Sequence, residues 1–435
     1  MLRRLPQMVN RPFVRNVVAV VSGTAASQAI AMAFAPLLTR LYGPETYGLQ
    51  GVFLTITGLL GTVSTLSYPM AIVLPQHDEE ALAIAWLSLI VGVLMTTGIT
   101  TVLIFYGDEV LGLLNAAEIL NLIYLIPAAL FLALIGDILV QWLIRKQAFA
   151  FLARIRVVTT LLTTTTKAGL GFVAPSALAL IGTSVIGSLL TGLLILRNIG
   201  SLRRNDPAVH RSLGLVRTIY RIARQHWDFP LLRTPQTLIN ALSQSLPVML
   251  LAAYSGPAAV GFYSIALLVL ALPSGLIGTS VMQVFYPRIT VAMHRGEDIQ
   301  RLIARATAAM AALGAVPFLL VAVSGPMLFG AVFGAGWEAA GVYSQILSPW
   351  LFLQYANKPA VAAIPALNLQ GGLLVYELFS TGSKILALYL GFKVFESEIA
   401  AILLFSLVGT IAYLWLIFWV IKQSRRVLCP RDTQL

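Results

Sequence analysis

Five charged side chains lie inside long apolar stretches of this 435-residue chain: Asp137, Lys167, Lys358, Glu377 and Lys384. A charge in the hydrocarbon of a bilayer costs about 2.5–3.5 kcal/mol on insertion scales, so such residues normally face a protein interior or a water-filled cavity. An ammonium group in that position can bind an anion, and a buried carboxylate can carry a proton. We therefore take the lysines as candidate substrate-binding residues and the two acids as candidate ion-coupling residues.

Lys167 shares a helical face, or nearly so, with Thr160, Thr163 and Thr164. This polar stripe predicts the wall of a wet lumen, in which Lys167 and Thr163 bind a ligand. The alternative is that Lys167 pairs with a carboxylate such as Asp137 and holds two helices together. The sequence leaves both interpretations open.

Glu377 and Lys384 are seven residues apart, so they share a helix face but stand about 10 Å apart by helical rise and cannot pair directly. Glu377 either carries a coupling proton or neutralises Lys358 or Lys384. Lys358 precedes Pro359, whose ring frees a nearby backbone carbonyl, and this favours a lumenal position. Asp137 lies near one end of its apolar stretch, and we expect it to reach Arg145 or Lys146.

Neutral polar residues inside apolar stretches form a second group of candidates. Asn240 and Gln244 are four residues apart on one helix face, and Gln28 lies in the first stretch. These side chains could contact sugar hydroxyls, or they could bond between helices. We include all three among the predicted substrate-binding residues.

The elements that would position these residues are membrane-spanning helices. Hydrophobic residues make up 58% of the chain and charged residues 11%, against roughly 25% charged in a soluble domain, so the chain lacks the polar surface that a water-soluble fold needs. Stretches of about twenty apolar residues are long enough to span a bilayer as helices. The twelve predicted spans are 15–38, 47–69, 81–106, 118–141, 154–174, 177–197, 234–254, 262–287, 302–324, 339–362, 370–391 and 398–421.

Basic residues are concentrated in every second gap between these spans. The gaps on the side of the two termini hold nearly all of the Arg and Lys, whereas the other side has only Arg40 and Lys393. The positive-inside rule therefore predicts that both termini are cytoplasmic. One gap on that side, residues 76–80, is acidic, which does not overturn the prediction because acidic residues contribute little to orientation.

A basic segment near the middle of the chain divides six spans from six. Within it, Arg217, Arg221 and Arg224 recur at helical spacing with apolar residues between them, a pattern typical of a helix at the membrane surface. Such a surface attracts anionic lipid or receives an anionic substrate headgroup. The predicted organisation is an N-terminal six-helix bundle (1–197), a basic linker with an amphipathic helix (198–233), and a C-terminal six-helix bundle with a tail (234–435).

The two halves resemble each other at their second helices. Gly43-Pro44 and Gly256-Pro257 enter these helices, and Tyr68-Pro69 and Tyr286-Pro287 close them. Two pseudo-symmetric bundles in parallel orientation usually place a substrate between them and rock to expose it to each side in turn. The predicted fold is therefore an all-α integral membrane protein with two six-helix bundles around a central cavity.

Other classes of protein fit the sequence poorly. The net charge of +12 could suggest nucleic-acid binding, but the basic residues flank apolar spans without interleaved aromatic residues. The single cysteine, Cys429, gives no disulfide framework or metal cluster, and no nucleotide-binding loop is evident. The N-terminus leads into a long span, which we interpret as an uncleaved first helix. We expect no cofactor, no metal and no nucleic-acid partner.

The N-terminal half also resembles a known family. The stretch Leu37-Leu38-Thr39-Arg40-Leu41-Tyr42-Gly43-Pro44-Glu45-Thr46-Tyr47-Gly48, then Ala71-Ile72-Val73-Leu74-Pro75 and Asp78-Glu79-Glu80-Ala81, is similar to the N-terminal signature of polysaccharide-biosynthesis flippases of the O-antigen type. These belong to the multidrug/oligosaccharidyl-lipid/polysaccharide exporter superfamily. In the C-terminal half, Gly256-Pro257 with Gly261-Phe262-Tyr263, and Leu328-Phe329-Gly330 to Trp337, add to the resemblance.

The resemblance implies a flippase in the bacterial inner membrane that moves a polyprenyl-pyrophosphate-linked oligosaccharide from the cytoplasmic to the periplasmic leaflet, and not an enzyme. Its expected partners are this substrate, membrane lipids, and the glycan polymerase and chain-length proteins of lipopolysaccharide synthesis, and the chain is expected to be a monomer. The alternatives are an ion-coupled multidrug or small-molecule exporter of the same superfamily, a membrane-embedded glycan polymerase or ligase, and a non-transporting scaffold. An exporter of that kind would need a more acidic N-terminal cavity. A polymerase or ligase would usually carry acid-base residues on a large outward loop.

The predicted topology can be tested with reporter fusions. Reporters fused near residue 210 and at the C-terminus should both report a cytoplasmic position, and a reporter fused near residue 110 should report a periplasmic one, because the charge asymmetry orients every span. Paired alkaline phosphatase and green fluorescent protein fusions measure this. A periplasmic signal near residue 210 would refute the assignment of the basic gaps.

Overall fold

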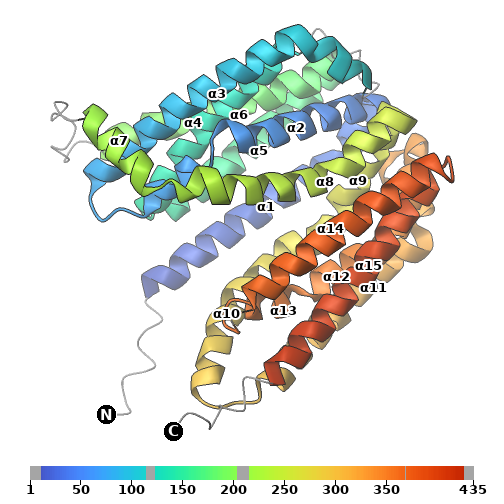
Figure 1. The fold of residues 1–435 in the computed structure, drawn as a ribbon. Helices are drawn as coiled ribbons and strands as arrows, with labels where there is room; N and C mark the ends of the chain where they lie inside the picture. Colours follow the sequence, from blue (N-terminus) through green and yellow to red (C-terminus); the bar gives the residue numbers. More distant parts are fainter. Residues whose placement is uncertain (1–10, 114–122, 203–214, 368, 426–435) are drawn as a thin grey trace. The chain divides into compact units, whose positions relative to one another are not determined.

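The computed structural model describes residues 11–113, 123–202, 215–367 and 369–425, which form helices joined by turns with no strand among them. The helices divide into two compact units, Met1–Val260 and Gly261–Leu435. Figure 1 shows the ribbon coloured along the chain. The prediction of an all-α fold is confirmed for this part of the chain. The predicted bundle boundaries at residues 198–233, and a cavity between the bundles, stay predictions.

The first unit is built mainly from long helices that begin or end at the predicted gaps. Its elements are α1 (Arg11–Leu41), α2 (Pro44–Ser64), the 3-10 helix η2 (Tyr68–Val73), α3 (Asp78–Leu113), α4 (Leu125–Arg145), α5 (Phe149–Val173), α6 (Ala177–Leu202), α7 (Leu215–Gln225), the π-helical turn η6 (Phe229–Arg233) and α8 (Thr234–Ser255). Within this unit α1 packs along α5, and α2 packs along α8. The segment 142–153 completes α4 and starts α5 around a turn at Gln147.

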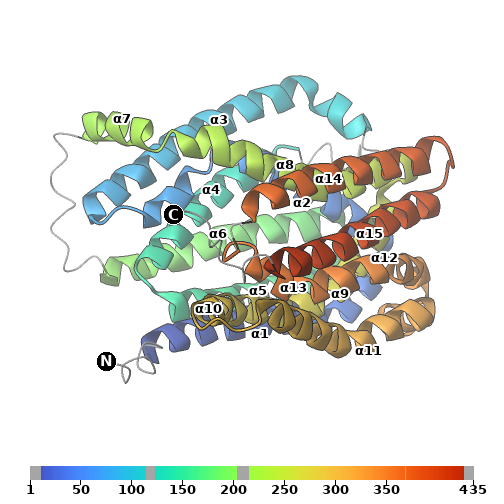
Figure 2. The same ribbon diagram turned by 60° about the horizontal axis from the view of Figure 1, so that its bottom comes forward.

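The second unit contains the remaining helices. They are α9 (Pro257–Pro273), the π-helical turn η7 (Ser274–Gly278), α10 (Thr279–His294), α11 (Ile299–Phe333), the 3-10 turn η8 (Ala335–Trp337), α12 (Glu338–Ala356), α13 (Lys358–Ala363), α14 (Gln370–Lys393) and α15 (Glu398–Ser424). The helix α9 starts at the end of the first unit and continues into the second. Figure 2 shows α14 and α15 side by side, as their contacts require.

Ten helical segments in the described residues are long and apolar enough to cross a membrane. They account for ten of the twelve predicted spans; the other two correspond to α5 and to α12 with α13, which do not meet the same criterion. A run of threonines and three basic residues lowers the hydropathy of α5, and Asn357 with Lys358 interrupts the other span. The predicted span 262–287 is divided by η7 into α9 and α10, so Tyr286-Pro287 lie inside α10. Tyr68-Pro69 do not close α2 either, because α2 ends at Ser64 and these two residues begin η2, so the predicted closing pairs are wrong in both halves.

Both Gly-Pro pairs begin helices as predicted, with the proline at the first helical position. Gly256 adopts φ +84°, a conformation that favours glycine, while Gly43 is extended. Further along α2, a methyl group added at Gly48 would overlap the Pro257 carbonyl, so glycine permits this contact between α2 and the start of α9. The start of α9 therefore lies directly against α2.

The amphipathic helix predicted in the basic segment is α7. Its Ile222 is buried against the η2 and α3 cluster that contains Ile72 and Ile84, and Arg221 lies 3.6 Å from Glu80. Three further arginines of the basic segment, Arg203, Arg204 and Arg211, lie outside the described residues, as does Cys429. The helix therefore covers the start of α3 and neutralises part of its acidic first turn.

The segment between η2 and α3 is fastened to the end of α4 by one guanidinium group. Arg145 donates from Nε to Asp78 Oδ1 at 2.8 Å, and from its terminal nitrogens to the carbonyls of Pro75 at 2.6 Å and Ile72 at 3.2 Å. Lys146 also pairs with Asp78. Asp137 makes neither bond, so the expectation that it pairs with Arg145 or Lys146 is wrong: both bases pair with the acid at the start of α3.

Replacing Arg145 with Ala should lower the free energy of unfolding by about 2 kcal/mol. Hydrogen bonds to charged groups contribute roughly 1.5–3 kcal/mol, and the partial exposure of Asp78 keeps the expected loss below the top of that range. Arg145→Lys should recover only part of the loss, because a lysine cannot bond a carboxylate and two carbonyls in the same fork geometry. Thermal unfolding in detergent measures both effects. The control is Arg156→Ala, which removes an exposed arginine with one 3.4 Å bond to Thr24; equal losses in both variants would contradict the role of Arg145.

Candidate functional site

The three lysines predicted to bind substrate lie on separate helices. Lys167 is in α5 of the first unit, while Lys358 begins α13 and Lys384 is in α14 of the second. Within the described residues, none of the three forms an ion pair with a carboxylate. Pairing between Lys167 and Asp137, the structural alternative, is therefore absent from the described part of the chain.

The N-terminal sequence signature positions Lys167. The Tyr42 hydroxyl donates a 2.8 Å hydrogen bond to the backbone carbonyl of Lys167, and Tyr42 is fully buried against Leu38, Ala168 and Leu180. The end of α1 is thereby fixed to α5 beside the lysine. Tyr42, a residue of the N-terminal family signature, therefore holds α1 against the helix that carries Lys167.

The threonines near Lys167 bond first to their own helix. Thr163 donates to the Thr159 carbonyl at 2.7 Å, and Thr164 donates to the Thr160 carbonyl at 2.7 Å. Such bonds use the hydroxyl proton and leave the oxygen able to accept. The polar stripe around Lys167 therefore offers acceptors, with the ammonium as its strong donor.

Lys384 lies among three aromatic rings that the sequence did not reveal. Its Nζ is 5.2 Å from the ring centre of Trp350, 5.7 Å from that of Tyr413 and 5.8 Å from that of Phe405. Cation–π contacts at these distances stabilise an ammonium without neutralising it. Gln354 donates to the Tyr413 hydroxyl at 3.0 Å and holds that ring. The rings come from α12 and α15, and their spacing in sequence carries no signal of this arrangement.

Lys358 occupies the break between α12 and α13. The preceding Asn357 is completely buried, and neither polar atom of its side chain has a hydrogen-bond partner among the described residues. Pro359 lies in the first turn of the short helix α13, where a proline is well tolerated. The aliphatic stem of Lys358 lies close to Gly278 of the turn η7. The predicted continuous span is therefore broken beside Pro359, and the lumenal role of Lys358 stays a prediction.

The remaining predicted residues differ in what they contact. On the exposed face of α8, Gln244 donates to the Asn240 side-chain oxygen at 2.8 Å, so these two residues bond to each other. Gln28 in α1 buries its side-chain oxygen without a partner in the described residues. Glu377 is exposed on α14 and forms no ion pair with Lys384 or Lys358, as its spacing predicted. Their binding and coupling roles stay predictions.

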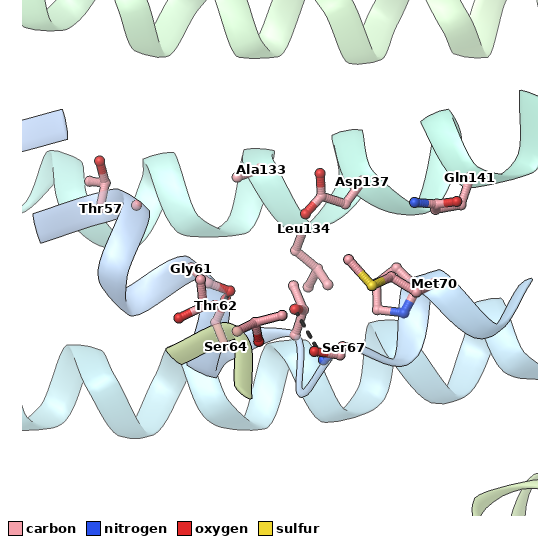
Figure 3. Close-up of a pocket in the computed structure, with 14 residues that line it drawn as sticks. Thr57, Gly61, Thr62, Ser64, Ser67, Met70, Ala133, Leu134, Asp137 and Gln141 are labelled. Carbon is pink, nitrogen blue, oxygen red and sulfur yellow. Dashed lines mark hydrogen bonds between the residues drawn. The ribbon is translucent and has the colours of Figure 1, made fainter. Parts of the chain in front are cut away.

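Asp137 lines a pocket inside the first unit, which the sequence reading missed. The pocket has a volume of about 340 Å³. Figure 3 shows Asp137, Leu134 and Gln141 on α4 across from residues of α2 and η2. Its lining residues are Thr57, Gly58, Gly61, Thr62, Ser64, Thr65, Ser67, Pro69, Met70, Ala133, Leu134, Asp137, Gln141 and Thr237. The four-residue spacing of Asp137 and Gln141 was the one available signal, because it places both on one face of α4.

The described residues offer no group of three or more His, Cys, Asp or Glu side chains that could hold a metal ion. What the chain does present is a set of cationic groups without carboxylate partners and, separately, a polar pocket with an acid. The first suits an anionic ligand, and the second suits a ligand that donates hydrogen bonds.

Comparison with known proteins agrees with this picture. Residues 13–293 match the family model described as polysaccharide biosynthesis protein. The succinoglycan biosynthesis transport protein ExoT of Rhizobium meliloti (strain 1021) is 25% identical over 317 residues, which are 71% of this chain and 60% of that protein. This chain therefore aligns with less than two thirds of that relative.

Solved structures share the fold at low sequence identity. An inward-facing multidrug resistance MATE transporter matches with a TM-score of 0.69 at 14% identity, over 96% of this chain and 98% of that one. The lipid II flippase MurJ in an inward closed conformation matches with a TM-score of 0.68 at 14% identity, over 95% and 90%. These proteins are transporters and flippases by name, not enzymes. The predicted two-bundle membrane fold is confirmed, and the chain belongs to the polysaccharide biosynthesis protein family.

Proposed function

We propose that this protein is a flippase that moves a polyprenyl-pyrophosphate-linked oligosaccharide from the cytoplasmic to the periplasmic leaflet of the bacterial inner membrane, with both termini cytoplasmic. The observation that carries the proposal is that Lys167, Lys358 and Lys384 have no carboxylate partner among the described residues. Placing three ammonium groups without carboxylate partners in apolar helices costs free energy, and binding an anion would offset that cost. The family and the named role of ExoT in succinoglycan transport support the same class of substrate.

The physical problem that such a protein solves is desolvation of the headgroup. A saccharide pyrophosphate loses its hydration when it enters hydrocarbon, at a large cost in free energy, whereas the apolar polyprenyl tail can remain in the lipid. The protein needs to supply only a hydrated path with cations for the phosphates and polar groups for the sugars. Alternating access would present that path to one leaflet and then to the other.

Energy for net movement requires a coupling device, and Glu377 and Asp137 are the proposed carriers. Both are carboxylates without an ion pair in the described residues. A carboxylate can carry a proton by alternating between its charged and its neutral form. Polymerase and chain-length proteins are the proposed partners that would use the delivered glycan.

Lys167→Ala should reduce flipping by about tenfold to a hundredfold, because a hydrogen bond to a charged group contributes roughly 1.5–3 kcal/mol. Lys358→Ala and Lys384→Ala should reduce it as well. Accumulation of the lipid-linked saccharide in the cytoplasmic leaflet measures the effect, with membrane insertion checked by immunoblot. Lys422→Ala, at an exposed position at the end of α15, is the matched control and should flip normally. Failure of all three lysine variants to insert would favour a structural role instead.

Glu377→Gln should abolish the dependence of flipping on the proton gradient, because glutamine cannot take up a proton. The measurement is uptake into everted vesicles with and without a protonophore. Glu396→Gln, in the exposed turn between α14 and α15, should leave the dependence intact. Gradient dependence that persists in Glu377→Gln would remove this residue from the coupling scheme.

A further inference from the structure

The Asp137 pocket has a chemical character that differs from the lysine sites. It lies between α2, η2, α4 and α8, all within the first unit, and six of its lining residues carry hydroxyl groups: Thr57, Thr62, Ser64, Thr65, Ser67 and Thr237. Asp137 is the acid in this lining, and Gln141 supplies an amide (Figure 3). No Lys, Arg or His occurs among the lining residues, all of which are described.

Most of the hydroxyl protons in the pocket are already used. Thr57 donates to the Phe53 carbonyl at 2.8 Å, and Thr62 donates to the Leu59 carbonyl at 2.7 Å. Ser64 donates to a carbonyl of α2 at 3.0 Å, and Thr237 to one of α8 at 2.9 Å. A hydroxyl that gives its proton to its own helix still has lone pairs to accept a hydrogen bond. Four of the six hydroxyls therefore act as acceptors toward the pocket.

The carboxylate strengthens this bias. Asp137 has no hydrogen bond or ion pair within the described residues, and an ionised carboxylate only accepts. The donors that remain in the lining are the Gln141 amide and the hydroxyls of Thr65 and Ser67, which accept from the Ser67 N–H and the Thr234 hydroxyl and donate to none of the described residues. A pocket with a carboxylate, more acceptors than donors and no cation repels an anion and suits a ligand that donates several hydrogen bonds. The pyrophosphate of the proposed substrate is excluded from it.

The size and the apolar part of the pocket indicate a small organic ligand and not a bare ion. Small-molecule pockets start at about 300 Å³, and about 340 Å³ is far more than a dehydrated ion occupies. Leu134, Pro69 and Met70 supply an apolar surface beside the acceptors. A sugar ring has this combination of features, with hydroxyl donors around its edge and C–H groups on its faces.

The pocket is also separate from Lys167. The helices α4 and α5 are consecutive and joined by a short turn, so they run in opposite directions. Counted from that turn at 1.5 Å per residue, Asp137 lies about 12 Å along α4 and Lys167 about 27 Å along α5. The two groups are therefore about 15 Å apart along the helix direction. A ligand that reached both would place its pyrophosphate at the lysine and a more distant sugar in the pocket.

We infer that the Asp137 pocket binds one sugar unit of the lipid-linked saccharide, and that it selects neutral or amino sugars and rejects sugars with a carboxylate. This inference rests on the proposed function for the origin of the sugar, and it adds a specificity that the lysines do not supply. Hydroxyl or ammonium groups of the sugar donate to Asp137 and the threonine oxygens, and an acidic sugar is repelled by the carboxylate.

Saturation-transfer-difference NMR on the full chain in lipid nanodiscs tests the inference, with glucose, glucosamine and glucuronate as probes. Glucose and glucosamine should receive saturation, and glucuronate should receive little. Asp137→Asn should weaken binding of glucosamine by about tenfold, because it removes a charge-assisted bond, and should lessen the discrimination against glucuronate. Asp108→Asn, an exposed acid near the end of α3, is the matched control.

A steric variant tests the pocket independently of charge. A side chain at Gly58 would meet no heavy atom within 4 Å of its Cβ, so Gly58→Leu should fold and fill the cavity, abolishing the signals of glucose and glucosamine. Gly98→Leu, at an equally open position of α3 outside the pocket, should leave them unchanged.

Several results would overturn the inference. These are equal signals from all three sugars, signals that survive Gly58→Leu, or absence of sugar binding together with Asp137-dependent thermal stabilisation by Na⁺, which would make the pocket a cation site. Flipping in cells separates this failure from failure of the proposed function. Loss of flipping on deleting the protein supports a flippase even if the pocket binds no sugar. Unchanged flipping on deletion refutes the proposed function whatever the pocket binds.

Discussion

The first unit depends on the guanidinium of Arg145. Its side chain is 9% exposed and bonds one carboxylate and several carbonyls of the segment between η2 and α3. Without this cation, the backbone oxygens of that segment would lose their partners and Asp78 would keep only Lys146. The interaction therefore fixes the chain between two long helices, and with it the position of η2 against α4.

This constraint also shapes the pocket. Asp137, Gln141 and Arg145 follow one another at four-residue spacing, so they form a single stripe along α4. At the end of the stripe Arg145 bonds the segment after η2, while Pro69 and Met70 of η2 form a wall of the cavity. Because Arg145 and Lys146 are engaged by Asp78, they do not neutralise Asp137. The ion pairs with Asp78 at the end of α4 therefore leave Asp137, two turns earlier in the helix, without a basic partner in the pocket.

The sequence was sufficient for the helices and insufficient for most of the site. Apolar length and the Gly-Pro turns predicted the long helices and the starts of α2 and α9, because both signals are local. The turn η7 and the break at Asn357 were not foreseen, since the hydropathy of these segments continues through them. The partner of Arg145 was predicted wrongly because Asp137 is closer in sequence, whereas folding brings Asp78, at the start of α3, to Arg145 at the end of α4. The rings around Lys384 come from two other helices, so no spacing rule could have found them.

The surroundings of the partly buried lysines Lys384 and Lys167 differ, and under the proposed function the difference bears on how an anion is held and released. Lys384 is stabilised by the faces of Trp350, Phe405 and Tyr413, whose quadrupoles attract a cation but add no net negative charge. A carboxylate partner would have cancelled the charge and competed with a phosphate for the same ammonium. Aromatic neighbours lower the cost of the unoccupied state and leave the full positive charge for a ligand. Lys167 lacks such rings among its described contacts, and the Tyr42 hydroxyl bonds its backbone carbonyl. In the proposed function, a pyrophosphate is bound at one leaflet and released at the other, and this requires ammonium groups whose charge the protein itself has not neutralised.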